Sequence, residues 1–154
     1  MEADTSRTGR LSAAVPPPEL AADLGVDIGE RAPVLRSQIV HRSGAVIQDS
    51  VSYFSMHALT VLPQLTREFV QGGAERRPGL TALYEWLASA GLTLTRREHL
   101  MPTPIPDAEV PPPQGWLSIR RLVSDQHDRL LEATDLRCDL NRSTLVYESP
   151  SAHP

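Results

Sequence analysis

Two of the three Arg-Arg pairs in this chain, at 96–97 and 120–121, have a residue type and a position that could serve chemistry. Both pairs fall in stretches with a strand-like pattern, where successive side chains point to opposite faces of a sheet. One member of each pair must therefore face the covered side. A buried guanidinium needs an anion beside it. The pairs predict either an anion-binding pocket or structural arginines that reach solvent or pair with Asp125 or Glu132.

Glu132 is a carboxylate on the more apolar face of its own strand. It shares that face with Thr134, Leu136 and Cys138, because side chains on one face recur every second residue. A carboxylate in such a place either forms a salt bridge with an arginine or contacts a ligand. The spacing leaves both interpretations open.

Residues for catalysis or for a metal ion are not arranged in any familiar pattern. The five histidines form neither a His-x-His nor an HExxH motif, so the sequence predicts no metal and no cofactor. A Gly-x-Ser-x-Gly nucleophile motif and phosphate-binding glycine loops are absent as well. The single cysteine, Cys138, is expected to be an inert, half-buried thiol. We expect a protein that is not an enzyme.

The length and charge of the chain fit one globular domain. It has 154 residues with a net charge of −4, and all 15 basic residues are arginine. A negative chain without a basic run is poorly suited to hold DNA by itself. It shows no signal peptide and no apolar run of membrane-spanning length, so we expect a cytoplasmic protein with no membrane partner.

The order of predicted elements indicates an α+β protein with a mostly antiparallel sheet. Residues 1–14 show no hydrophobic period and are predicted to be a flexible tail or an inter-domain linker. Residues 15–149 are predicted to form one domain, and 150–154 a second tail. Helices are predicted at 19–25, 63–70 and 80–90, and strands at 33–42, 45–54, 92–101, 116–124, 130–138 and 143–148, with a proline-rich connector at 102–115.

Four segments, in order, resemble the UTRA domain, the effector-binding domain of GntR/HutC transcription regulators. Residues 24–36 resemble its opening Leu-Gly…Gly…Pro-Val-Leu-Arg, and residues 44–54 its Gly…Ser-Tyr strand. Residues 83–91 resemble its Leu-Tyr-Glu helix, and residues 121–132 its last hairpin. The resemblance spans residues 20–148. It implies the chorismate-lyase-like fold: a six-stranded antiparallel sheet, helices that cover a ligand pocket, and a homodimer.

The same resemblance implies a set of pocket residues. Family members that bind phosphosugars carry two arginines where this chain has Gln38 and Val40, and a glutamate where it has Ser50. Their serine and aromatic positions hold Ala82 and Cys138 here, whereas Tyr84 and Glu132 are kept. With Arg36, Arg97 and Arg121 added as available cations, these residues form the predicted ligand site. Because the phosphate-binding arginines are missing, we expect an effector other than a sugar phosphate, uncharged or singly charged and more apolar.

The function implied is that of a ligand sensor and dimerisation domain. DNA binding would belong to a winged helix-turn-helix domain that this sequence does not contain, so the chain would be an excised effector domain or a natural stand-alone version. The protein would act as a repressor. Two alternatives remain open: a chorismate-lyase-like enzyme that clamps a dicarboxylate with Arg36, Arg97 and Arg121 beside Glu132, or a dimerisation module whose pocket is filled by side chains.

Overall fold

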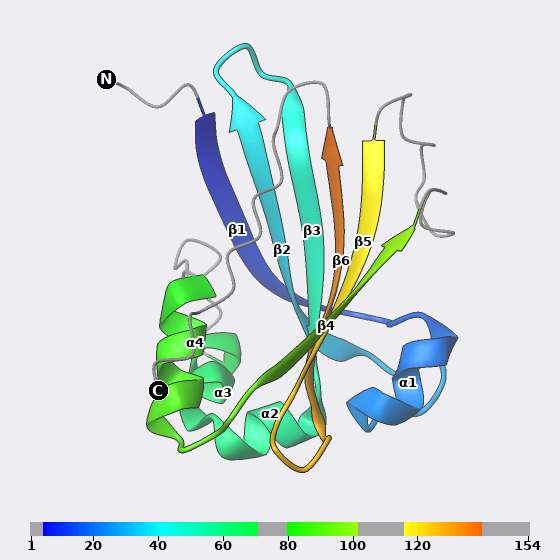
Figure 1. Ribbon diagram of the computed structural model, residues 1–154, viewed down its shortest axis with the longest axis vertical. Helices are drawn as coiled ribbons and strands as arrows, with labels where there is room; N and C mark the ends of the chain where they lie inside the picture. The colour runs from blue at the N-terminus through cyan, green and yellow to red at the C-terminus, as the bar shows by residue number, and fades with distance from the viewer. Residues whose placement is uncertain (1–4, 71–79, 102–115, 140–154) are drawn as a thin grey trace, which may run out of the picture.

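The computed structural model describes residues 5–70, 80–101 and 116–139, which form one six-stranded sheet with four helices (Figure 1). The strand order is β1-β2-β3-β6-β5-β4, and all neighbours in this order are antiparallel. The strands are β1 Thr5–Ala14, β2 Ala32–His41, β3 Val46–Phe54, β4 Thr95–Met101, β5 Trp116–Ser124 and β6 Leu130–Asp139. The helices are α1 Pro18–Leu24, α2 Met56–Val61, α3 Pro63–Val70 and α4 Leu80–Ser89. The predicted α+β class and six-stranded antiparallel sheet are confirmed.

The ends of the elements follow from local chemistry. Helix α1 has proline in its first turn, where no N–H partner is needed, and its C-cap is Gly25 in the left-handed conformation. Gly44 has a φ of 90° and closes the β2–β3 hairpin. Helix α2 was not predicted. Its signal is Ser55, whose side chain caps the helix by accepting a hydrogen bond from the backbone N–H of Ala58 at 2.9 Å.

Strand β1 corrects the prediction of a flexible tail or linker over residues 1–14. Residues 5–14 pair along their whole length with β2, from Thr5 opposite His41 to Ala14 opposite Ala32. The strand lies at the sheet edge, and most of its side chains are exposed, so its sequence carries little hydrophobic alternation. Backbone pairing with β2 holds it in place. The predicted strand at 143–148 and the connector at 102–115 lie outside the described residues.

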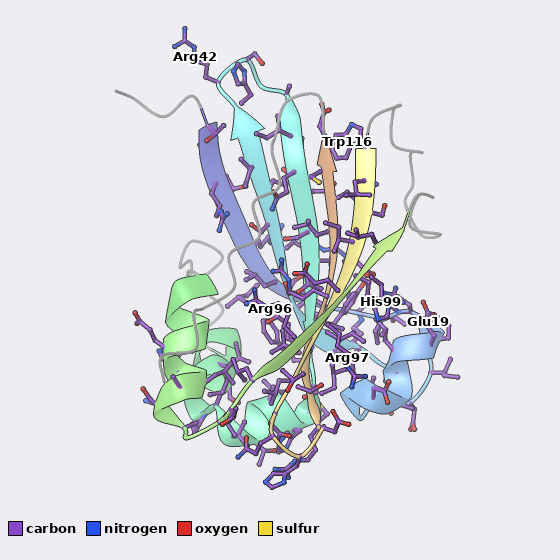
Figure 2. The ribbon with its side chains drawn as sticks, in the orientation of Figure 1. Glu19, Arg42, Arg96, Arg97, His99 and Trp116 are labelled. Atoms are coloured by element: carbon purple, nitrogen blue, oxygen red, sulfur yellow. The ribbon has the colours of Figure 1, made fainter. Side chains whose placement is uncertain are left out.

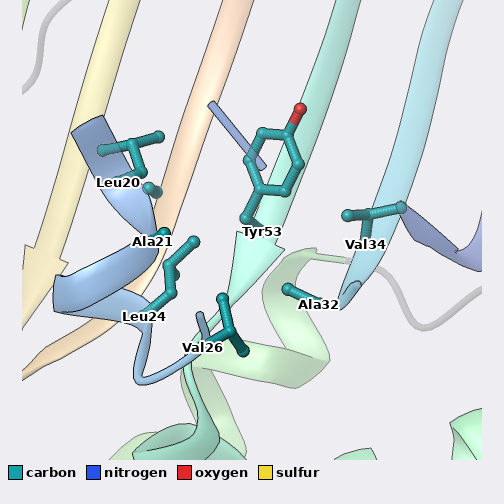
Figure 3. Packing of buried hydrophobic residues seen from close by; sticks show 8 residues of the cluster. Leu20, Ala21, Leu24, Val26, Ala32, Val34 and Tyr53 are labelled. Carbon is teal, nitrogen blue, oxygen red and sulfur yellow. The ribbon is translucent and has the colours of Figure 1, made fainter. Parts of the chain in front are cut away.

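The two faces of the sheet carry two separate apolar clusters. On one face, hereafter the α1 face, Leu20 and Leu24 pack with Val34 and Tyr53 around the end of β3 (Figure 3). On the opposite face, hereafter the helical face, residues of α2, α3 and α4 pack on others from the strands, among them Leu35 and Phe54. Neighbours in a strand point to opposite faces, so Val34 and Leu35 divide between the two clusters.

An irregularity where β6 begins sets the face of every later residue in that strand. The pairing shifts between Val123 and Ser124 of β5, which lie opposite Glu132 and Leu130. Leu130 packs against the α1 cluster, whereas Leu131 belongs to the cluster of the helical face. Glu132 lies opposite Phe54 and therefore also on the helical face.

Candidate functional site

The helical face holds a buried carboxylate that is only half satisfied. Glu132 is 2% exposed, and its Oε1 accepts a short hydrogen bond from Thr134 Oγ1. Thr134 Oγ1 also lies 2.8 Å from Ser52 Oγ; since its own proton goes to Glu132, the Ser52 hydroxyl donates to it. Glu132 Oε2 is buried and makes no hydrogen bond with any residue that the structure describes.

The pKa of Glu132 is raised. Burial is the main cause, because it penalises the charged carboxylate. The hydroxyl groups of Thr134 and Ser52 and the positive charges of Arg121 and Arg96 act in the opposite direction without cancelling it. The Ser52–Thr134–Glu132 chain thus lies beside the apolar cluster of the helical face, and one carboxylate oxygen lacks a donor among the described residues.

Arginines border this carboxylate across the neighbouring strands. The cross-strand partners Glu98, Arg121 and Thr134 lie in one row, and Arg121 Nε donates to Glu98 Oε1 at 2.8 Å. Arg96 belongs to the next row, which ends at Glu132. Figure 2 shows Arg96 on the side of β4 toward α2–α4 and Arg97 on the side toward α1. The alternation predicted for the Arg-Arg pairs is therefore confirmed.

The other member of the 120–121 pair has a structural role on the α1 face. Arg120 Nε donates to Asp135 Oδ1 at 2.8 Å, and its Nη1 donates to Glu19 of α1 at 3.0 Å. The hydrogen bonds to Asp135 are the main reason why the pKa of Arg120 is raised. In the same way Arg137 Nε donates to Asp49 Oδ1 at 2.9 Å. Among the ion pairs of the described residues, Arg120 pairs with Asp135 and Glu19, Arg121 pairs with Glu98, and Asp125 pairs with Arg129.

The structure divides the predicted site residues between the two faces. Four share the helical face by register, namely Ser50, Arg121, Glu132 and Cys138. Arg36, Gln38 and Arg97 lie on the α1 face; Gln38 is in a row with Asp49 and Arg137. Val40 follows a register shift in β2. Ala82 and Tyr84 belong to α4, but their side chains lie outside what the structure describes.

The prediction that Gln38 belongs with Glu132 fails because of strand parity. A shift of one residue moves a side chain to the other face of a sheet. The β2 positions on the helical face are Ser37, opposite Ser50, and Ile39, opposite Gln48. Counting alternate residues from Leu35 would have found them. The chorismate-lyase-like alternative needs Arg36, Arg97 and Arg121 together beside Glu132. The structure does not bring them together, since Arg36 and Arg97 lie on the opposite face from Arg121 and Glu132.

Cys138 lies at 0% exposure on the helical face, and its pKa is raised, first by burial and then by the charge of Asp139. It is a buried thiol with little thiolate character. Within the described ranges, no three His, Cys, Asp or Glu side chains gather as metal ligands would. None of the helices in those ranges is long and apolar enough to cross a membrane.

Solved structures of transcription regulators share this fold. No protein-family model and no curated protein matches the sequence. The structure of PhnF from Mycobacterium smegmatis matches 96% of this chain with a TM-score of 0.61 and 20% identity, and the match covers 64% of that chain, so our chain spans under two thirds of its length.

Two further matches are to separate domains of such regulators. The effector-binding domain of the Bacillus subtilis trehalose repressor matches 96% of our chain and 99% of its own, with a TM-score of 0.54 and 15% identity. The ligand-binding domain of a putative GntR-family regulator from Bordetella bronchiseptica matches 95% of our chain and 93% of its own, with a TM-score of 0.58 and 18% identity. The fold is therefore that of GntR-family effector domains.

Proposed function

We propose that this chain is the small-molecule effector-binding domain of a GntR-type transcription regulator. The observation that carries the proposal is the fold: almost the whole chain superposes on domains solved as the effector- or ligand-binding parts of such regulators. The domain would begin with β1 at residue 5, which completes its sheet, and would extend to residue 149. DNA binding would belong to an attached domain, and the regulator would work in the cytoplasm.

The effector would bind on the helical face beside Glu132. A buried oxygen that finds no donor is costly, so Glu132 Oε2, which has none among the described residues, marks a place where a ligand donor would be stabilised. Ser37, Ser50 and Ser52 lie on the same face and supply further hydroxyl groups. We propose Tyr84 of α4 as a further contact of the effector.

The chemistry of this face supports an effector without a phosphate. A phosphate beside Glu132 would place like charges together and would raise the cost of ionising that carboxyl still further. Arg121, one of the arginines on this face, already donates to Glu98. A hydroxylated ligand that is uncharged or singly charged avoids both penalties and can donate to Oε2.

Regulation would work by population shift in a homodimer. An effector that binds one arrangement of the two subunits more tightly changes the fraction of dimers in that arrangement. The spacing of attached DNA-binding domains would follow, and a repressor of the HutC type would leave its operator. The coupling cannot exceed the difference in the effector's affinity for the two arrangements.

A thermal-shift screen tests the proposal. The panel contains neutral glycosides, small carboxylates, polyketide-like compounds and sugar phosphates, and each hit is then titrated calorimetrically. A ligand at a hundredfold excess over its Kd stabilises the fold by about 2.7 kcal/mol, which is readily seen in a domain of this size.

Matched glutamate variants locate the ligand. We expect Glu132→Gln to weaken binding of the hit about tenfold or more, whereas Glu30→Gln in the exposed α1–β2 loop leaves it unchanged. A shift caused by sugar phosphates alone contradicts the phosphate-free effector. If no compound shifts the transition, a ligand-free dimerisation module becomes the better interpretation.

A further inference from the structure

A cavity lies on the α1 face of the sheet, apart from Glu132. Its volume is about 510 Å³; it is open to solvent and is bordered by α1, the first residues of β4 and the turn between β5 and β6. The charged side chains in its wall are Asp23, His57, Arg97, Asp128 and Arg129. Figure 2 shows Arg97 on the side of β4 toward α1. The volume lies within the range of small-molecule sites.

One wall of the cavity is built by a buried carboxylate behind it. Asp125 is 1% exposed and accepts hydrogen bonds from the backbone N–H groups of His127 at 2.9 Å and Arg129 at 3.0 Å. Its Oδ2 also lies 3.0 Å from Arg129 Nε and 3.1 Å from His57 Nε2. These contacts fix the imidazole and the guanidinium from behind. Arg129 keeps its Nη groups, which make no hydrogen bond with any other described residue.

Three exposed charges in this wall, of both signs, have no ion pair with the described residues. They are Arg97, Asp23 and Asp128, and no hydrogen bond through their side chains is found within the described parts of the chain. Asp125, by contrast, is already matched by Arg129 and His57. The cavity therefore offers two guanidinium donors and two carboxylate acceptors to whatever enters it.

We propose that this cavity binds a small zwitterion that carries a carboxylate and an ammonium group, in the size range from an amino acid to a short peptide. The carboxylate would meet Arg97 and the Nη groups of Arg129, and the ammonium group would meet Asp23 and Asp128. A simple anion such as phosphate would face both carboxylates, and a simple cation would face both arginines. Only a ligand with both charges satisfies the whole wall.

The test uses alanyl-alanine and three blocked forms of it. The free dipeptide carries both charges, the N-acetyl form only the carboxylate, the C-terminal amide only the ammonium group, and the doubly blocked form neither. We expect calorimetric titration of the full chain to show binding of the free dipeptide, about tenfold or greater weakening by either single block, and no binding of the doubly blocked form.

Charge-neutral variants place the ligand in this cavity. Arg97→Gln and Asp23→Asn should each weaken the free dipeptide about tenfold, whereas Arg31→Gln, an exposed arginine of the α1–β2 loop, should not. Circular dichroism and the Tm of each variant show that it is folded. Equal binding of all four forms, or no binding of the free dipeptide, overturns the proposal.

One outcome separates this site from the proposed effector site. If Glu132→Gln abolishes binding of the dipeptide while Arg97→Gln leaves it intact, the ligand lies on the helical face. The cavity on the α1 face is then refuted as a zwitterion site, and the effector-binding function stands. Binding that depends on Arg97 and not on Glu132 supports the second site, whatever the effector screen shows.

Discussion

Two buried carboxylates seven residues apart in the β5–β6 hairpin have opposite surroundings. Asp125 accepts four hydrogen bonds, two from backbone N–H groups and two from side chains. Glu132 accepts one from Thr134 at Oε1 and leaves Oε2 without a donor among the described residues. Burial alone would raise the pKa of Asp125, but the hydrogen bonds outweigh it and hold that pKa at about 2, whereas the pKa of Glu132 is raised.

The difference separates a carboxylate that builds the fold from one that is available to a ligand. The hydrogen bonds of Asp125 fix the turn and tie α2 to it through His57. Glu132 gains little from its neighbours, so its burial costs free energy that a ligand donor could recover. Removing the carboxylate of Asp125 should therefore mainly lower stability, and removing that of Glu132 should mainly weaken ligand binding.

Asp125→Ala should give the largest effect. It removes the partner of two backbone N–H groups and of two cationic side chains, so we expect the free energy of unfolding to fall by about 3 kcal/mol. Urea denaturation measures the change. The loss of one neutral hydrogen bond costs about 1 kcal/mol. A smaller loss than this would show that the turn is stable without the Asp125 carboxylate.

Glu132→Gln should change stability far less, by about 1 kcal/mol or less at neutral pH, because the amide still accepts from Thr134 and carries no charge to bury. Urea denaturation with Asp125→Ala run in parallel makes the comparison direct. A destabilisation as large as that of Asp125→Ala would mean that Glu132 is structural and not held for a ligand.

The two carboxylates should also give opposite pH dependences. Asp125 has a folded pKa of about 2 against an ordinary 3.8, so its stabilising contribution is present above pH 3.8 and is lost as the pH falls toward 2. Glu132 has a raised pKa, so its contribution is present below the ordinary value of 4.5 and is lost as the pH rises through the folded pKa.

Thermal unfolding from pH 2 to 9 measures both contributions. Asp125→Asn should flatten the acid side of the Tm curve, and Glu132→Gln should flatten the side above pH 4.5. Curves of wild type and Glu132→Gln that stay parallel above that pH would contradict the raised pKa of Glu132.

Most of the fold was predictable from sequence because local signals agree with tertiary structure. Gly25, Gly44 and the alternating strands from residue 33 onward mark elements that the structure confirms. Strand β1 was missed because an exposed edge strand needs no hydrophobic alternation.

Only part of the candidate site was predictable. The burial of Glu132 could be inferred from its strand, but the face of Gln38 depends on the strand register, and a shift of one residue moves its side chain to the other face. The contacts of Asp125 come from a turn and from α2, which no periodicity reveals.

The smallest effect is expected from Glu98→Gln, and it probes how far the arginines around Glu132 are already committed. The pair of Arg121 and Glu98 is partly exposed, with side chains 23% and 16% accessible, so its loss should cost only about 0.5 kcal/mol. The amide of this variant can still accept from Arg121 Nε, but it is neutral and leaves the positive charge of Arg121 less neutralised near Glu132. The pKa of Glu132 should therefore fall, and the Tm of Glu98→Gln should decline less than that of the wild type as the pH rises above 4.5.

Glu85→Gln, an exposed glutamate of α4, is the control. If both variants follow the wild-type pH curve, Arg121 does not act on Glu132, and the carboxylate is isolated even from the arginine in the neighbouring row.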